Sequence, residues 1–490
     1  HQFPSEQNYQ PFFHSTYKSS SLPYNTNHTQ FSILDSLIPC KFSLLFQFFD
    51  QQGNYKIEKQ TDEAYKAAIA NQFQKDFIEA DKKVRLLNQA LSGEILKVFP
   101  LPKDKNNKWV SNLELNHATN TPLDIVKNAL PFYLNECVNA TQTKNYKVVD
   151  QLLKGISDYQ KKFGAKVMLS EEKINTEILY NKYDIFKKLF SWYLYAGVLM
   201  FIFVIWKIFS KKRWVAIATK ASHIIIGLLF LMHLAGLLIR WYISGHAPWS
   251  DAYESMIYVA WATMFFGLAF GRKSELTVAS TAFVTAIILM VAHWNWMDPA
   301  IGNLQPVLNS YWLMIHVAVI VASYGPFTLG MVLGLVALFL MIFTNAKNKQ
   351  KMDLTIQEIT YINEMALTVG LVMLTIGNFL GGQWANESWG RYWGWDPKET
   401  WALISIMVYA FVIHARFVPA LRGKWIYNVM SVFAFASILM TYFGVNFHLS
   451  GMHSYASGEK QAVEIYLYIA LAVVFIAAIA FWKHQKFYKK

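Results

Sequence analysis

Long apolar runs fill the second part of the chain, whereas polar and apolar positions alternate more evenly before about Leu189. Nine runs are each near or above the ~20 apolar residues that a helix needs to cross ~30 Å of hydrocarbon. They cover residues 191–209, 214–240, 253–271, 276–293, 311–344, 361–380, 398–418, 426–446 and 462–482. This pattern predicts an all-α polytopic membrane protein with about nine transmembrane helices. The fifth run is over-long and must tilt or extend beyond the bilayer.

Residues 1–190 are expected to form a mostly helical region outside the membrane, partly disordered at its start. Apolar positions recur at helical spacing over 61–98 and 146–163, and Ser170 is placed to cap a third helix that runs directly into the membrane. We interpret this region as a domain that docks a partner. The predicted organisation is therefore an extracytoplasmic region at 1–190, a transmembrane anchor with a cytoplasmic linker at 191–213, and a membrane domain at 214–490.

The distribution of cations predicts the orientation of the chain. Its net charge is +13, but Lys and Arg lie between apolar runs and not along one basic face, which excludes nucleic acid as a partner. On one side of the expected spans, the connections at 211–213, 272–273, 347–351, 416–424 and 483–490 are rich in cations. The other side carries only Arg240, Arg391, Lys398 and Lys460. The cation-rich side is therefore expected to be cytoplasmic.

The two cysteines, Cys40 and Cys137, fall in the region expected to lie outside the membrane. They either form a disulfide or stay free, because two positions in a sequence do not define a pair. The chain contains no C-x-x-C-H motif, so it is not itself a c-type cytochrome.

One stretch, Gly381–Trp401, concentrates tryptophan between two expected spans. It holds Trp384, Trp389, Trp393, Trp395 and Trp401. One or two such rings per helix end are ordinary at a membrane interface, so this density predicts a loop at 381–401 that forms a platform for a large flat ligand. At its end, Asp396, Pro397 and Glu399 match the N-cap, N1 and N3 positions of a helix. Asp396 and Glu399 therefore begin the next helix, contact the ligand, or do both.

Residues Trp389–Glu399, WGRYWGWDPKE, resemble the tryptophan-rich signature W-G-x-x-W-x-W-D-x-K-E of haem-handling membrane proteins. From about Trp214 to the C-terminus the chain resembles the CcsA (ResC) family, the membrane subunit of System II cytochrome c assembly. The resemblance implies that the chain carries haem b across a membrane and promotes its thioether attachment to the C-x-x-C-H motif of apocytochrome c. The chain would then be a component of a holocytochrome c synthase.

Two other functions stay open at this point. Related signatures occur in CcmC and CcmF, so the alternative is a haem exporter or delivery module without thioether chemistry. A membrane b-type cytochrome would favour His pairs within helices and would not require so many Trp in one stretch. The resemblance also implies a multi-pass protein of the bacterial inner membrane, in contact with lipid, with the tryptophan stretch on the periplasmic side.

Haem iron needs axial ligands, and neutral imidazole is the usual choice. From the residues alone, His316 would make a helix–helix hydrogen bond, and His453 would be a solvated loop residue. The resemblance marks both as external haem ligands, but it does not mark the nearby His448. The haem-binding residues expected beside them are Trp384, Trp389, Trp393, Trp395, Arg391 and Asp396.

The resemblance makes His414 one of two intramembrane His that receive haem from inside. The second would come from a CcsB (ResB) subunit, whose tail residues 1–190 match by position. His223, at a similar depth, is either a substitute ligand or, as is commoner, a packing residue. We expect Arg391 to bind a haem propionate through its fork-shaped guanidinium, and Arg240 to snorkel to the membrane interface.

Overall fold

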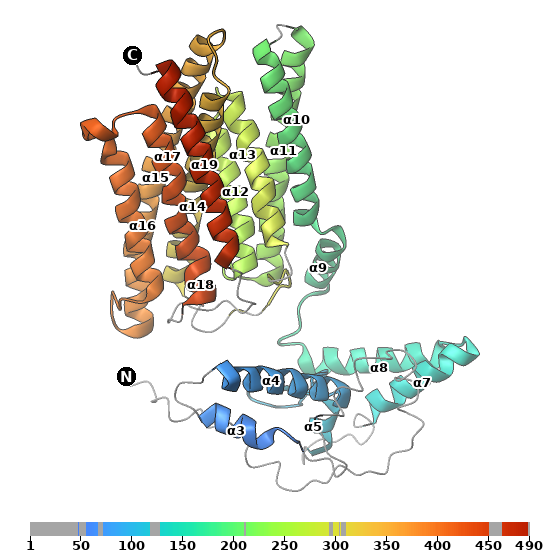
Figure 1. Ribbon diagram of the computed structural model, residues 1–490. Helices are drawn as coiled ribbons and strands as arrows, with labels where there is room; N and C mark the ends of the chain where they lie inside the picture. The colour runs from blue at the N-terminus through green and yellow to red at the C-terminus, as the bar shows by residue number, and fades with distance from the viewer. Residues whose placement is uncertain are drawn as a thin grey trace. The chain divides into compact units, whose positions relative to one another are not determined.

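The computed structural model describes residues 48, 55–66, 72–117, 128–209, 212–293, 297–302, 304, 310–449 and 463–488. The chain divides into two compact units, residues 1–169 and residues 170–490. Nearly all regular structure in the described residues is helical, which confirms the predicted all-α class (Figure 1).

The described part of the first unit combines helices with one short β-hairpin. The helices are α3 (Glu58–Lys66), α4 (Gln72–Ser92), α5 (Asn112–His117), α7 (Ala129–Thr143) and α8 (Lys147–Gly164). Strand β1 (Phe99–Pro100) pairs antiparallel with β2 (Trp109–Val110). Helix α8 holds this hairpin, because the Tyr159 hydroxyl donates to the Pro100 carbonyl at 3.2 Å. The helix predicted over 61–98 is wrong in extent: two helices, α3 and α4, occupy this part, and β1 already begins at Phe99.

The second unit is a bundle of long helices (Figure 1). They are α9 (Glu171–Tyr183), α10 (Ile185–Phe209), α11 (Arg213–Ser244), α12 (Ala252–Phe270), α13 (Glu275–Ala292), α14 (Tyr311–Ile342), α15 (Lys349–Trp389), α16 (Pro397–His414), α17 (Lys424–Leu439), α18 (Val445–His448) and α19 (Val463–Tyr488). The π-helix η5 (Met440–Gly444) joins α17 to α18, and the 3-10 turns η3 (Ala415–Phe417) and η4 (Pro419–Leu421) follow α16.

Ser170 caps α9 as predicted, since its side chain accepts the backbone N–H of Lys173. The expected unbroken run into the membrane is interrupted, however. Asp184 adopts a left-handed conformation with φ of 41°, so α9 ends at Tyr183 and α10 starts afresh.

Eight helices among the described residues are long and apolar enough to cross a membrane, which confirms the polytopic class. The remaining expected span, the third at 253–271, is occupied by α12, a helix of 19 residues. Helix α12 carries the polar residues Glu254, Ser255 and Thr263. All three are buried inside the bundle.

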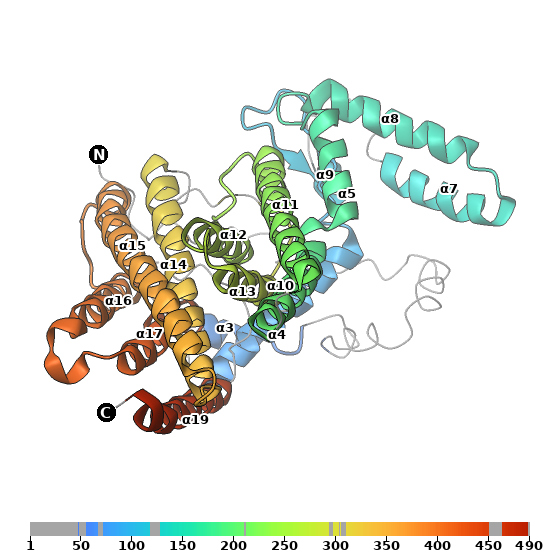
Figure 2. The ribbon, with the colours of Figure 1, turned by 90° about the horizontal axis from the view of Figure 1, so that it is seen from above.

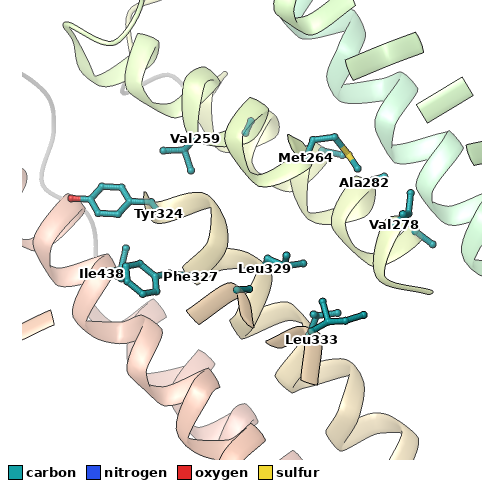
Figure 3. Close-up of a cluster of buried hydrophobic side chains, with 14 of the residues drawn as sticks. Val259, Met264, Val278, Ala282, Tyr324, Phe327, Leu329, Leu333 and Ile438 are labelled. Atoms are coloured by element: carbon teal, nitrogen blue, oxygen red, sulfur yellow. The ribbon is translucent and has the colours of Figure 1, made fainter. Parts of the chain in front are cut away.

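Helix α14 lies at the centre of the second unit and packs against α12, α13, α15, α17 and α19. Seen from above, α10 to α13 lie on one side of it and α15 to α17 on the other (Figure 2). Its Phe327 and Leu329 are fully buried in the apolar core drawn in Figure 3. A Cβ at Gly325 would lie 2.8 Å from the carbonyl carbon of Ala262. Glycine therefore allows α14 and α12 to approach this closely, as small residues do in membrane helices.

The tryptophan-rich stretch is mostly helical, so the prediction of a loop over 381–401 is wrong in extent. Helix α15 has 41 residues, about 61 Å at 1.5 Å per residue, and ends only at Trp389. Gly381 and Gly382 do not break it but give room to neighbours: a Cβ at Gly381 would lie 3.2 Å from the His316 ring. Gly390 caps the C-terminus of the helix, and its φ of 71° is readily adopted by glycine. The loop itself is residues 390–396.

Candidate functional site

A cavity of about 440 Å³ lies at the end of the bundle where the 390–396 loop connects α15 to α16. Pockets of roughly 300–1,000 Å³ are the usual size for small-molecule and cofactor sites. Side chains from α12, α14, α15, α16, η5 and α18 line it, together with residues of the connections at 246–251 and 297–304. Aromatic residues are prominent in the walls: Trp249, Tyr253, Tyr324, Trp384, Tyr392, Trp393 and Tyr442.

His316 lines this cavity from the first turns of α14 and is 6% exposed. Its Nδ1 lies 2.8 Å from the Trp312 carbonyl oxygen. Because a carbonyl can only accept, Nδ1 carries the proton, and Nε2 of the neutral ring keeps its lone pair. The imidazole stacks on Trp384 with a centroid separation of 5.3 Å and an interplanar angle of 25°. The backbone, Trp384 and the bare face of Gly381 together fix the orientation of the ring.

The four expected tryptophans occupy different positions and do not form one flat platform. Trp384 is 1% exposed and stands behind His316, and Trp389 packs on Trp384 with an interplanar angle of 66°. Trp393 lines the cavity. Trp395 is 72% exposed and meets Trp393 edge-on at 5.8 Å. The structure thus brings Trp384 and Trp393 to the cavity wall, with Trp389 as support.

The predicted helix start after the loop is confirmed in detail. Asp396 is the N-cap of α16 and Pro397 its first residue, and Asp396 and Glu399 form a capping box. One oxygen of Glu399 accepts the backbone N–H groups of Gly394 at 2.8 Å and Asp396 at 3.3 Å. These bonds tie the loop that carries Trp393 to the first turn of α16. The buried carboxylate of Asp396 therefore has a structural role in this geometry.

Another part of the cavity wall comes from the π-helix η5, a rare element that often marks functional sites. It presents Thr441 and Tyr442 to the cavity. The Tyr442 hydroxyl lies 2.6 Å from Ser255 Oγ and donates to the Ala252 carbonyl at 2.9 Å. Tyr324 of α14 meets Tyr442 edge-on at 6.2 Å. This wall is therefore fixed by polar contacts between α12 and η5.

The expectation that Arg240 snorkels to the interface is wrong. Its side chain is fully buried, and its Nε donates to Glu254 at 2.8 Å. Its other nitrogens donate to the carbonyls of Pro299 at 2.9 Å and Ala300 at 3.1 Å. A buried guanidinium that is paired with a carboxylate and hydrogen-bonded does not have to reach the membrane interface to be solvated. Arg240 thus fixes the connection at 297–302, which lines the cavity.

The remaining expected residues either do not line the cavity or lie outside the described part of the chain. His414 is exposed at the last turn of α16, about 26 Å along the helix axis from Pro397. Arg391 is exposed and is not among the described lining residues. His223 is partly buried in α11. His453 lies outside the described residues, as do Cys40 and the side chain of His448.

Several lining residues were not anticipated from the sequence. His246 and Tyr442 were given no role, and Lys398 was considered only as a cation on the sparse side. The sequence did offer a signal for His246, because this residue lies in a short connection near Trp249, on the same predicted side of the membrane as the tryptophan stretch. Tyr442 gave none, since it lies within the apolar run at 426–446, and the sequence does not reveal the π-helix that carries it.

Comparisons with known proteins identify relatives of this chain. A family described as cytochrome C assembly protein matches residues 249–453, which include most of the cavity lining. Protein NrfI of Wolinella succinogenes is 39% identical over 426 residues, which are 84% of this chain and 46% of NrfI. The chain therefore spans about half the length of that relative.

Two further similarities differ in how much of each protein they cover. A solved cytochrome c haem lyase CcmF overlaps 62% of this chain and 51% of its own with 14% identity and a TM-score of 0.41, too little to support an inference. The cytochrome c biogenesis protein CcsA of Prochlorococcus marinus (strain MIT 9301) is 31% identical over 292 residues, 53% of this chain and 93% of that CcsA. On this coverage, the chain belongs to the CcsA family of cytochrome c assembly proteins.

Proposed function

We propose that this chain binds haem b in the cavity beside the 390–396 loop and presents it for attachment to apocytochrome c. The observation that carries the proposal is His316: an oriented imidazole in the wall of an aromatic-lined cavity of about 440 Å³. Aromatic and aliphatic walls suit a porphyrin face, and Nε2 of His316 suits its iron. His453 is proposed as the second axial ligand on the family resemblance.

The proposed reaction is the addition of two substrate thiols across the two haem vinyl groups. Each cysteine sulfur forms a bond to the vinyl carbon next to the ring, and its proton goes to the terminal carbon. Atoms and electrons balance without an added oxidant or reductant. The chain's contribution is to hold the porphyrin in a fixed orientation while the C-x-x-C-H segment approaches, since positioning alone can supply ~7–11 kcal/mol of a barrier.

The proposed path of haem begins at the opposite end of α16. There His414 is exposed, and its Nδ1 donates to the Ala410 carbonyl at 2.7 Å. We propose that His414 receives haem on the cytoplasmic side together with a ligand from a CcsB-like partner. The excess of Lys and Arg in alternate connections supports this orientation in a bacterial inner membrane. The cavity and the first unit would then face the periplasm.

Co-expression with an apocytochrome carrying one C-x-x-C-H motif tests this function. We expect haem that stays on the cytochrome after denaturing electrophoresis, and its loss in His316→Ala. The matched control is His484→Ala, which changes an imidazole of α19 and should leave attachment intact. Haem bound by the chain without any covalent cytochrome, with every required partner subunit present, would instead favour an exporter or delivery module.

A further inference from the structure

The acidic side chains that line the cavity already have partners. Asp251 accepts the backbone N–H of Glu254 at 2.6 Å, and Asp298 accepts that of Ala300 at 2.9 Å. Glu399 accepts the two loop N–H groups described above. These carboxylates therefore serve to shape the surrounding backbone.

Among the lining residues that the structure describes, the cation is Lys398, in the first turn of α16. Its Nζ donates to Oδ1 of Asn446 at 3.1 Å, a neutral partner. Among the described residues, no carboxylate oxygen lies within the 4.0 Å of an ion pair with Lys398. Asp396, the acid nearest along the chain, accepts the backbone N–H of Lys398 instead.

Lys398 shares the first turn of α16 with Asp396 and Glu399, whose carboxylates form the capping box. A helix N-terminus carries roughly half a positive charge, which favours anions and disfavours cations. Lys398 adds a full positive charge at that end, beside a partly enclosed cavity. The two capping-box carboxylates accept backbone N–H groups, so a carboxylate on a ligand in the cavity would give the Lys398 ammonium a charged partner in place of the neutral Asn446.

We infer that Lys398, with Asn446 beside it, is the carboxylate-binding point of the cavity and takes one haem propionate. This inference rests on the proposed function and deepens it. In protoporphyrin IX the two propionates occupy one edge and the vinyl groups the other pyrroles. A ligand at the iron from His316 leaves rotation about the iron–nitrogen axis free, and a propionate at Lys398 stops it. Lys398 thus positions the vinyl groups by binding a propionate. The sequence suggested Arg391 for that propionate contact.

Titration of the purified full chain with haem and with haem dimethyl ester tests this inference, because the ester has no negative charge. A hydrogen bond to a charged group predicts that the native chain binds haem about tenfold to a hundredfold more tightly than the ester. Lys398→Gln should abolish that preference while keeping the affinity for the ester. Lys398→Arg keeps the charge and should restore much of the preference.

Three results would overturn parts of this account separately. Equal affinity of the native chain for haem and its ester would remove the carboxylate site while leaving haem binding intact. If Lys398→Gln lowered the affinity for haem and for the ester by the same factor, Lys398 would have a purely structural role. Binding of neither ligand by the native chain would overturn the proposed function itself.

Discussion

At the scale of single residues, the site depends on how firmly one imidazole is held. His316 has its Nδ1 on the Trp312 carbonyl and one ring face on Trp384. Gly381 leaves room for the ring edge, since a Cβ there would lie 3.2 Å from Cδ2. The position of the His316 ring thus depends on the absence of a side chain at Gly381.

Gly381→Ala should therefore separate haem binding from stability. Alanine favours a helix by ~1 kcal/mol over glycine, so thermal stability should hold or rise. The added methyl group must push the imidazole aside, which costs about 1 kcal/mol or more and lowers haem affinity roughly fivefold. Haem per protein and melting temperature measured on one preparation report both effects.

The matched control is Gly227→Ala in α11, where nothing lies within 4 Å of the new Cβ. It should leave haem content unchanged. Full haem content in Gly381→Ala would show that His316 has more freedom than the structure indicates.

At the scale of elements, the start of α16 determines where the loop lies. Asp396 and Glu399 hold the loop through backbone N–H groups, so the cap needs acceptor oxygens and not charge at Asp396. Asparagine is as good an N-cap as aspartate, whereas alanine costs ~0.5–2 kcal/mol.

Asp396→Asn should accordingly keep native stability and haem content, and Asp396→Ala should lower both. Both variants are checked by monitoring thermal unfolding with circular dichroism and by measuring the haem content of the same samples. Loss of haem in Asp396→Asn at unchanged stability would point to a direct contact between this carboxylate and the ligand.

The same element shows what the sequence could and could not predict. The cap was predictable because Asp396, Pro397 and Glu399 act within one turn. The end of α15 was not, because Gly381 and Gly382 lie inside the helix and leave room for His316 and Tyr392, and His316 is distant in the sequence. Arg240 was misjudged for the same reason, since Glu254 and the carbonyls that hold it come from other segments.

At the scale of the whole molecule, the apolar runs predicted the helices well, because each run must satisfy its own backbone inside a membrane. The cavity was harder to predict, since its lining comes from many separate elements. His316, which lines the cavity, was selected as a haem ligand by the resemblance; from the residues alone a packing role was favoured.

The orientation of the molecule can be tested on one helix. Helix α15 joins the cation-rich connection before Lys349 to the tryptophan-rich end. In a background with Cys40 and Cys137 replaced by serine, Glu387→Cys should react with an impermeant thiol reagent in intact cells. Ala346→Cys, equally exposed at the other end, should react only after lysis. The reverse pattern would invert the proposed topology.

The absorption spectrum of the reduced protein tests the central claim, that His316 holds haem iron in this cavity, most directly. His316→Ala should change the spectrum of the bound haem, and added imidazole should restore it in part, because the cavity remains. Two matched variants, His246→Ala and Trp393→Ala, alter the same cavity wall but should keep the native spectrum, with Trp393→Ala holding several-fold less haem. A native spectrum and full haem content in His316→Ala, indifferent to imidazole, would contradict the account.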